Sequence, residues 1–212
     1  MTKDVYILGI GHNTGVFIDL TEQCGYNVAG LYHYNNERTG EFDHGYKILG
    51  SFDELFNTKS LEGKHFVLSM GNLKTREELT NKIYSINGNI PNLIHPTALV
   101  SKYAKIGKGT CIGPFTNIQA DSTIGNGTVL LSGVNISHTN KIGDFCFIAG
   151  GATVGAYVEV DDCVLIGMSA TIVSGKVPKI GKNAVIGAGS VVVNEIKENC
   201  IVAGNPAKVV RY

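Results

Sequence analysis

The sequence is poor in charge and has no tryptophan, and the low charge excludes several classes of protein. Only 17% of its 212 residues are charged, and 18 basic residues balance 18 acidic ones. Without a basic surplus or a basic cluster, nucleic acid is not expected as the main partner. No apolar run approaches the ~20 residues that a membrane-spanning helix requires, so we expect no membrane association.

The cysteines are few and lack the spacing of a metal or redox motif. None of the five forms a CxxC pair: Cys24, Cys111, Cys146, Cys163 and Cys200. Residues 1–8 lead directly into an apolar, strand-like run, so no signal peptide is expected. We therefore expect reduced thiols in a cytoplasmic protein.

The C-terminal part of the chain has a sequence period of six. Every sixth position from Val100 to Ile172 is aliphatic, and after a slip of two residues the series resumes at Ile180, Ile186 and Val192. Neither a helix nor a simple strand produces this period. A short-period β-helix does, with three hexads closing each coil. Residues eighteen apart should then stack roughly 4.8 Å from one another, as neighbouring strands do.

Two further features of the repeats bear on the coil. The fourth position after each aliphatic residue is generally small or β-branched, as at Thr110, Thr128 and Ala152. This fits a second inward position near a corner, where a larger side chain would clash. Residues 174–179 interrupt the series and are predicted to bulge from the coil.

The first 90 residues lack the period and alternate strands with helices. Apolar runs at 5–8, 28–32 and 66–70 predict three strands, and Ser51 with Glu54 and Thr75 with Glu78 form capping-box patterns that open helices. This order predicts a small parallel sheet with crossover helices. A boundary near residues 87–91 separates the predicted domains, 1–90 and 91–212.

A glycine-rich turn at residues 9–15 joins the first strand to a helix. Such turns bind phosphate, because free N–H groups and the helix dipole both favour an anion. The spacing is G-x-G-x-x-x-G, which differs from the dinucleotide fingerprint, and residues 33–35 place no acidic side chain after the second strand. The turn therefore argues against NAD binding. It is compatible with phosphate binding and equally with a tight turn that binds no ligand.

The two halves together resemble a known family. The motifs that carry the resemblance are residues 9–15, Gly71-Asn72 with Arg76, Asn92–Ala98, Ser137-His138 ahead of Ile142-Gly143, and Val202–Lys208. With them the chain resembles hexapeptide-repeat nucleotide-sugar acetyltransferases, notably UDP-4-amino-sugar N-acetyltransferases of the bacillosamine type and sialic acid O-acetyltransferases. The resemblance implies a small Rossmann-like N-terminal domain followed by a left-handed parallel β-helix.

The same resemblance implies an activity and its sites. The enzyme would move an acetyl group from acetyl-CoA to the amine of a nucleotide-linked amino sugar, as a homotrimer. The N-terminal domain would hold the nucleotide sugar with Gly11, His12, Asn13, Gly71 and Asn72, and CoA would lie along Ala156, Met168, Gly187 and Ala188. Two alternatives are a sugar or sialic acid O-acetyltransferase and a nucleotide-sugar-binding protein without enzymatic activity.

His138 stands at the position that matches the family's general base. It is the only histidine inside the repeats, whereas a zinc site of the carbonic anhydrase type on this fold needs three, so no metal is expected. An imidazole titrates near neutral pH, which suits removal of a proton from an attacking amine. A backbone N–H would hold the oxyanion, and the resemblance places this donor at a Gly or Ala near Ala156.

The residue after His138 departs from the family pattern. Thr139 replaces the usual acidic residue. Because residues eighteen apart should stack, Asp121 is expected one coil below Thr139, and we hypothesise that it supplies the missing carboxylate. A solvated corner aspartate is equally compatible with the sequence, and Thr139 could instead mark a hydroxyl acceptor.

Overall fold

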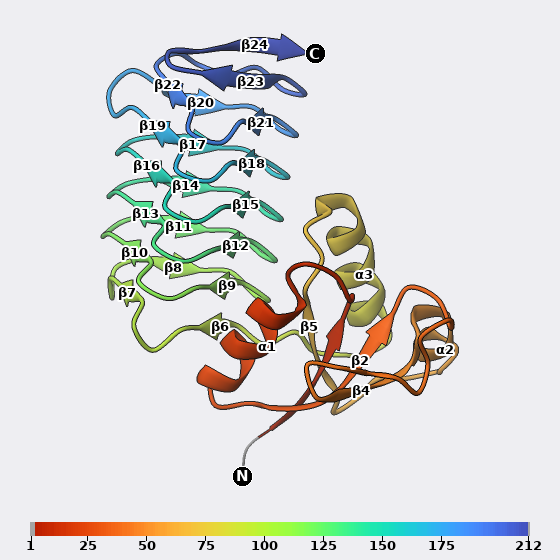
Figure 1. The fold of residues 1–212 in the computed structure, drawn as a ribbon. Helices are drawn as coiled ribbons and strands as arrows, with labels where there is room; N and C mark the ends of the chain where they lie inside the picture. The colour runs from red at the N-terminus through yellow and green to blue at the C-terminus, as the bar shows by residue number, and fades with distance from the viewer. Residues whose placement is uncertain (1–2, 212) are drawn as a thin grey trace. The chain divides into compact units, whose positions relative to one another are not determined.

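The computed structural model describes residues 3–211, and the chain divides into two compact units, Met1–Leu93 and Ile94–Tyr212 (Figure 1). The division falls between residues 93 and 94, whereas the sequence predicted 90 and 91. Residues 1–2 and 212, at the ends of the predicted domains, lie outside the described residues. Within the described chain, every helix is too short or too polar to cross a membrane.

Unit 1 is a small parallel sheet with three helices. The sheet has the order β3-β4-β2-β1-β5, and only β3 is antiparallel to its neighbour. The strands are β1 (Asp4–Leu8), β2 (Asn27–His33), β3 (Phe42–Asp43), β4 (Tyr46–Ser51) and β5 (His65–Leu68), and the helices are α1 (Thr14–Gln23), α2 (Phe52–Phe56) and α3 (Leu73–Ser85). The predicted alternation of strands and helices is confirmed. The hairpin of β3 and β4 was not predicted, because β3 has two residues and β4 includes a glycine.

One of the two predicted capping boxes is present. At the start of α2, the Glu54 N–H donates to Ser51 Oγ at 3.1 Å, and the Ser51 N–H donates to Glu54 Oε2 at 2.9 Å. The box predicted at Thr75 and Glu78 is wrong. Helix α3 begins earlier, and Asn72 caps it by accepting the Thr75 N–H at 2.9 Å. An Asn cap competes well with a Thr cap, and the sequence pattern considered only the threonine.

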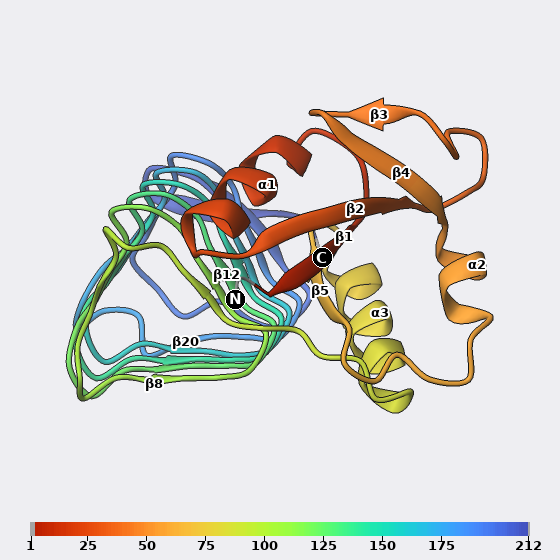
Figure 2. The ribbon, with the colours of Figure 1, turned by 90° about the horizontal axis from the view of Figure 1, so that it is seen from below.

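Unit 2 is a parallel β-helix with three sides. The first side holds β7 (Leu99–Val100), β10 (Asn117–Ile118), β13 (Asn135–Ile136), β16 (Thr153–Val154), β19 (Thr171–Ile172) and β22 (Val191–Val192). The second side holds β8 (Lys105–Ile106), β11 (Thr123–Ile124), β14 (Lys141–Ile142), β17 (Glu159–Val160) and β20 (Lys179–Ile180). The third side holds β6 (Leu93–Ile94), β9 (Cys111–Ile112), β12 (Val129–Leu130), β15 (Phe147–Ile148), β18 (Leu165–Ile166), β21 (Val185–Ile186), β23 (Ile201–Gly204) and β24 (Ala207–Arg211). Figure 2 shows the coils superimposed, with their flat sides aligned.

The strand register confirms the predicted coil of three hexads. Ile118 pairs with Ile136, eighteen residues on, and this offset recurs along all three sides. Glu159 instead pairs with Lys179, so the interruption at residues 174–179 does bulge from the coil. The predicted fold class, a Rossmann-like domain followed by a left-handed β-helix, is confirmed.

The inward positions of the β-helix are filled as the period predicted. From Ile112 onward the sixth-position aliphatic residues are at most 3% exposed and form one core cluster. The second inward slot of each hexad, four residues after the aliphatic position, also holds buried side chains. Its hydroxyl residues are fully buried, and four of the five donate to a carbonyl of the next coil, as Thr116 does to Leu131 at 3.1 Å. Asn140, which the pattern did not include, occupies the same slot with no exposed surface.

Candidate active site

His138 lies at the corner between the first and second sides of the β-helix. It follows β13, and its side chain is exposed. The imidazole Nδ1 is 3.1 Å from Thr139 Oγ1, and the His138 backbone N–H donates to Gln119 Oε1 at 3.1 Å. No hydrogen bond joins Nε2 to any residue from 3 to 211. The exposed ring can therefore accept a proton from a bound molecule.

Tyr157 stands directly against the His138 ring. The two ring centroids are 5.2 Å apart, and the ring planes meet at 89°, an edge-on contact. The phenol is 67% exposed, so it forms a wall beside the imidazole. Aromatic pairs favour this arrangement. The sequence did not predict Tyr157, although its signal was available: it lies eighteen residues after Thr139 on the same corner.

Thr139 and Asp121 occupy the same corner in successive coils, as the stacking predicted. Both adopt left-handed backbone geometry, with φ near 61°, and the Thr139 N–H donates to the carbonyl of Ala120 at 3.0 Å. Among the described residues the only side-chain hydrogen bond of His138 is with Thr139. Asp121 is exposed and makes no hydrogen bond to the imidazole. Any effect of the Asp121 carboxylate on His138 would therefore act through space.

The structure does not support Ala156 as the oxyanion donor. The Ala156 N–H donates to Ser174 Oγ at 2.7 Å, so the donor expected for the thioester carbonyl is already in use. Ser174 begins the bulge that interrupts the hexads. Ser174 lies eighteen residues after Ala156, the regular stacking offset. The sequence did not reveal the hydrogen bond because the repeat pattern carries no side-chain hydrogen-bond geometry.

Three of the four residues predicted to bind CoA lie at a different corner from His138, whereas Ala156 follows β16 and shares the corner of His138. Met168 follows β18, and Gly187 and Ala188 follow β21, so all three lie between the third and first sides. Met168 is 62% exposed and Ala188 is also exposed. The Gly187 N–H donates to the Val202 carbonyl at 2.8 Å. One copy of the chain therefore does not bring these residues and His138 to the same corner.

Unit 1 contains a cavity at the ends of β1 and β5. Its volume is about 380 Å³, and all five predicted sugar-nucleotide residues line it: Gly11, His12, Asn13, Gly71 and Asn72. The cavity also has side chains that the sequence did not predict. Tyr34, Phe52 and Met70 contribute apolar walls, and the Tyr34 side chain is 65% exposed. Apolar and aromatic side chains, together with the His12 imidazole and the Asn13 amide, suit a ligand with a flat ring and polar substituents.

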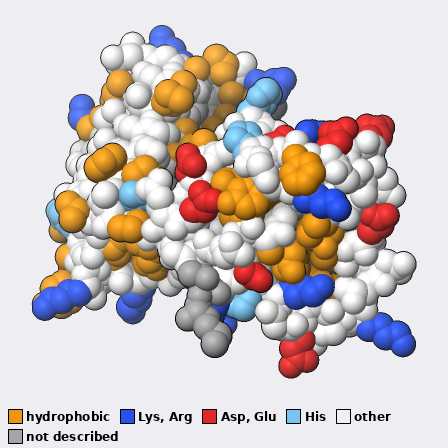
Figure 3. Space-filling view, turned by 60° about the horizontal axis from the view of Figure 1, so that its bottom comes forward, with side chains coloured by type: hydrophobic (Ala, Val, Ile, Leu, Met, Phe, Trp, Pro, Cys, Tyr) orange, Lys and Arg blue, Asp and Glu red, His pale blue; other side chains and the backbone are white. Residues whose placement is uncertain are grey.

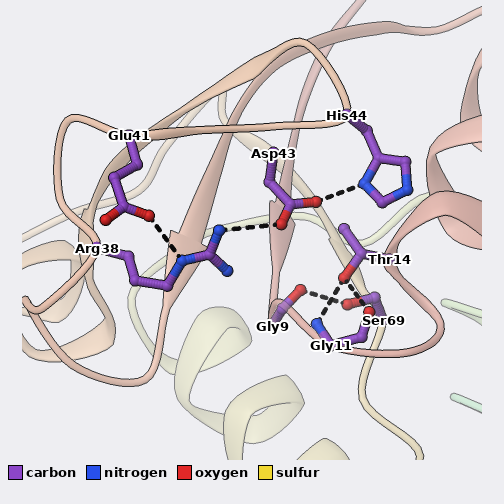
Figure 4. Close-up of polar contacts among 8 residues, drawn as sticks. All are labelled: Gly9, Gly11, Thr14, Arg38, Glu41, Asp43, His44 and Ser69. Atoms are coloured by element: carbon purple, nitrogen blue, oxygen red, sulfur yellow. Dashed lines mark hydrogen bonds and ion pairs between the residues drawn. The ribbon is translucent and has the colours of Figure 1, made fainter.

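Hydrogen bonds hold the two loops that line the cavity. The Gly11 N–H donates to Thr14 Oγ1 at 2.7 Å, and Ser69 Oγ donates to the Gly9 carbonyl at 2.5 Å (Figure 4). Gly9 has φ of +97°, and a Cβ there would lie 2.9 Å from Met70 Cε. The buried Arg76 guanidinium donates to the Leu68 carbonyl at 2.6 Å, at the end of β5. The loop positions are therefore set before any ligand binds.

An ion-pair network stands beside the glycine-rich loop. Arg38 donates to Glu41 Oε2 at 2.9 Å and to Asp43 Oδ2 at 3.2 Å, and Asp43 also bonds His44 (Figure 4). Burial alone would raise the pKa of Asp43, but the hydrogen bonds from His44 and Arg38 outweigh burial and lower it. A Cβ on Gly15 would lie 2.8 Å from His44 Nε2, so the β3–β4 hairpin packs on the first turn of α1.

Family comparisons cover both units. Residues 4–83 match the PglD N-terminal domain, and residues 103–138 match the bacterial transferase hexapeptide family (six repeats). Among curated proteins, a 2,3,4,5-tetrahydropyridine-2,6-dicarboxylate N-acetyltransferase of Clostridium perfringens is 50% identical over 48 residues, which are 23% of this chain and 20% of that protein. The chain spans no more than about a quarter of the length of the curated relatives it matches.

Solved structures match the chain over its whole length. PerB from Caulobacter crescentus, in complex with CoA and GDP-perosamine, is 26% identical with a TM-score of 0.87, covering 100% of this chain and 99% of that one. The acetyltransferase domain of PglB from Neisseria gonorrhoeae, in complex with acetyl coenzyme A, is 26% identical with a TM-score of 0.87, covering 99% and 100%. The class that the sequence predicted, acetyltransferases, is thus the class of these relatives. The resemblance to hexapeptide-repeat nucleotide-sugar acetyltransferases is confirmed: this chain joins a PglD N-terminal domain to bacterial transferase hexapeptide repeats.

Proposed function

We propose that this protein transfers the acetyl group of acetyl-CoA to the amine of a nucleotide-linked amino sugar. The observation that carries the proposal is the exposed imidazole of His138, bound through Nδ1 to Thr139 and with Nε2 unbonded among the described residues. PerB, which is bound to CoA and a nucleotide-linked amino sugar in its structure, shares this fold along the whole chain.

His138 would act as the general base. The neutral amine attacks the thioester carbonyl carbon, Nε2 takes the proton from the nitrogen, and the carbonyl oxygen gains the charge. The tetrahedral intermediate then collapses, the carbon–sulfur bond breaks, and the proton passes from the imidazole to the departing thiolate. The products are the amide and CoA. Direct attack needs no covalent acyl-enzyme, and a positioned base contributes typically 10²–10⁴-fold to such a proton transfer.

Thr139 and Asp121 would support the base in different ways. Thr139 Oγ1 lies 3.1 Å from Nδ1 and holds the ring in one orientation, the role that an acidic residue has elsewhere in the family. Asp121, one coil below on the same exposed corner, would favour the charged ring through space. Because Asp121 is exposed, salt would screen this second effect.

We assign the nucleotide sugar to the cavity of unit 1. The helix dipole at the start of α1 favours the phosphates, and Tyr34 and Phe52 offer apolar surface to a base or a sugar. The residues directly after β2, Tyr34, Asn35 and Asn36, include no acidic side chain to bind a ribose.

We also propose that the first side of the β-helix is buried between copies in a homotrimer. Side chains alternate along a strand, so the first residue of each strand points outward. The six outward residues of the first side are uncharged: Leu99, Asn117, Asn135, Thr153, Thr171 and Val191. The second side carries Lys105, Lys141, Glu159 and Lys179 outward, with ion pairs such as Lys179–Glu159 at 3.6 Å. Figure 3 shows hydrophobic side chains standing among uncharged ones on the surface of the β-helix.

Such an assembly would complete the donor site. His138 borders the first side at one corner, and Met168, Gly187 and Ala188 border it at the other. Packing first sides around a closed ring would bring one corner of a copy to the opposite corner of its neighbour. CoA would then lie between copies, along Met168, Gly187, Ala188 and Ala156.

We also propose that the protein works in the cytoplasm, where its five free cysteine thiols would stay reduced.

The test is release of free CoA from acetyl-CoA in the presence of a panel of acceptors. The panel holds nucleotide-linked amino sugars with different bases, the matching hydroxyl sugars, and sialic acids. We expect CoA release with an amino sugar and an acetamido product in the mass spectrum. Release with hydroxyl acceptors alone would establish the O-acetyltransferase instead. Thermal stabilisation by a nucleotide sugar, without stabilisation by CoA or turnover, would indicate a binding protein.

A further inference from the structure

We propose that Asn140 is a positioning residue for His138, an inference that rests on the proposed function. Asn140 lies two residues after the base, is fully buried, and fills the second inward slot of its coil. The other polar residues of this slot are hydroxyls, such as Ser122 and Thr128. A carboxamide in their place carries a nitrogen donor and an oxygen acceptor, and each of them hydrogen-bonds the backbone beside the active site.

The amide nitrogen of Asn140 holds the residue before the base. Nδ2 donates to the Ser137 carbonyl at 2.8 Å and makes a longer contact of 3.5 Å with the Val154 carbonyl. Ser122 Oγ donates to the same Ser137 carbonyl at 2.8 Å. The carbonyl of the peptide bond between Ser137 and His138 therefore accepts two hydrogen bonds, one from Ser122 in the preceding coil and one from Asn140 in the same coil.

The amide oxygen of Asn140 holds the residue after the aromatic wall. Oδ1 accepts the Val158 N–H at 2.7 Å, and Val158 directly follows Tyr157, whose ring stands edge-on to His138. One buried side chain thus joins the backbone at His138 to the backbone at Tyr157. A displacement of the base relative to this wall requires breaking at least one buried hydrogen bond, which is costly.

The hydroxyl residues of the slot make this connection less fully, because one oxygen must serve as both donor and acceptor. Ser122 Oγ donates to a carbonyl fifteen residues on and accepts an N–H eighteen residues on, from Asn140. Thr128 repeats the pattern with Gly143 and Cys146, at 2.8 and 3.0 Å. A serine at position 140 would accept the Val158 N–H in the same way. Its single hydroxyl hydrogen would go to a carbonyl fifteen residues on, or be shared with the carbonyl three residues back, as Thr110 shares it between Gly125 and Gly107 at 3.0 Å each. Asn140→Ser therefore weakens the hydrogen bond to Ser137, and Asn140→Ala removes both the donor and the acceptor.

The experiment compares the kcat and KM values of Asn140→Ala, Asn140→Ser and Thr128→Ala. Thr128→Ala removes two equivalent buried hydrogen bonds at a corner away from His138, so it is the matched control for lost stability. We expect kcat of Asn140→Ala to fall roughly tenfold to a hundredfold, as for a base displaced by about 1 Å, with the KM for acetyl-CoA within about twofold of the wild-type value. Asn140→Ser should fall less, and Thr128→Ala should keep a wild-type kcat at a similarly lowered unfolding temperature.

Two outcomes would overturn the inference: a wild-type kcat in Asn140→Ala, or an equal loss of kcat in Thr128→Ala. His138→Ala separates this from the proposed function. If the wild type transfers no acetyl group to any acceptor of the panel, the proposed function itself fails, and if His138→Ala retains full activity, the base role of His138 fails and the positioning role with it. If it is inactive while Asn140→Ala remains fully active, only the positioning role fails.

Discussion

At the scale of the residue, the site depends on one imidazole and its immediate contacts. His138 and Thr139 were both predicted from the sequence, because the hexads place them at a corner and the family motif singles them out. Tyr157 and Asn140 were not predicted. Their roles depend on contacts between successive coils: Tyr157 lies nineteen residues after His138, and Asn140 bonds Val158, eighteen residues on. A residue pattern records size and polarity at a position and carries no hydrogen-bond geometry.

Removing the partner of the imidazole should slow the reaction. Thr139→Val deletes the hydroxyl that lies 3.1 Å from Nδ1 and keeps the side-chain volume. Because the ring loses a fixed orientation, we expect kcat to fall about tenfold, at low and high ionic strength alike. Steady-state kinetics at two salt concentrations measures this. A wild-type kcat in Thr139→Val would show that Thr139 does not orient the base.

The neighbouring carboxylate should act differently. Asp121→Asn removes an exposed charge that makes no hydrogen bond to the ring, so we expect a loss of kcat of only about twofold to fivefold at low salt. At about 1 M salt, where the screening length is about 3 Å, the loss should disappear. A loss that persists in high salt, or no loss at low salt, would contradict a through-space role for Asp121.

Cys146 gives a prediction for stability at alkaline pH. Burial raises the pKa of its thiol to about 12, above the value of about 8.5 for an exposed cysteine. The neutral thiol therefore contributes its full stability below about pH 8.5, and this contribution is lost as pH rises toward the folded value. Valine occupies the same inward slot at Val134 and Val158, so Cys146→Val should lose less unfolding free energy than the wild type between pH 9 and pH 11. Parallel loss in both proteins, measured by urea unfolding, would refute the assignment.

At the scale of the element, the six-residue period predicted the β-helix nearly completely. The aliphatic positions, the eighteen-residue register and the bulge at 174–179 all follow from spacing, because each coil repeats one local geometry. Unit 1 was predicted less fully. The β3–β4 hairpin and the Asn72 cap of α3 depend on short segments with no repeated signal.

Close stacking of the coils should make some corner glycines intolerant of a side chain. A Cβ on Gly107 would lie 2.6 Å from the Gly125 carbonyl carbon in the next coil, whereas a Cβ on Gly175, in the bulge, meets nothing within 4 Å. We expect Gly107→Ala to lower the free energy of unfolding by about 2–3 kcal/mol, as overpacking does. Gly175→Ala should cost about 1 kcal/mol, for its φ of +71° alone. Urea unfolding compares the two, and a larger cost at Gly175 would contradict the stacking argument.

At the scale of the whole molecule, the two units carry different parts of the proposed function. The cavity of unit 1 gathers the five predicted substrate residues, although Tyr34 and Phe52 become its walls only through the tertiary fold. The β-helix places the base and Ala156 on one corner of the first side, and Met168, Gly187 and Ala188 on the other. This separation is seen only when the hexads are arranged as a three-sided coil. The separation is the reason that the proposed donor site requires two copies of the chain.

A charge on the first side should disrupt both assembly and activity. Thr153→Lys introduces a lysine among the uncharged outward residues of the first side, while Thr123→Lys makes the same change on the second side, between Lys105 and Lys141. We expect the first variant to sediment as a monomer with lowered activity, because a buried unpaired charge is costly. The second variant should sediment and turn over as the wild type does. A trimeric, active Thr153→Lys variant would place the interface elsewhere.

The most direct test of His138 as the general base is a single-turnover experiment with His138→Ala, acetyl-CoA and the amino-sugar acceptor that the panel identifies. Mass spectrometry follows the acetylated sugar over time, and thermal unfolding confirms that the variant is folded and binds CoA. Without the imidazole, the folded, CoA-bound variant should form product at least about a hundredfold more slowly than the wild type. Product formation at the wild-type rate would show that the imidazole of His138 does not take the proton from the attacking amine.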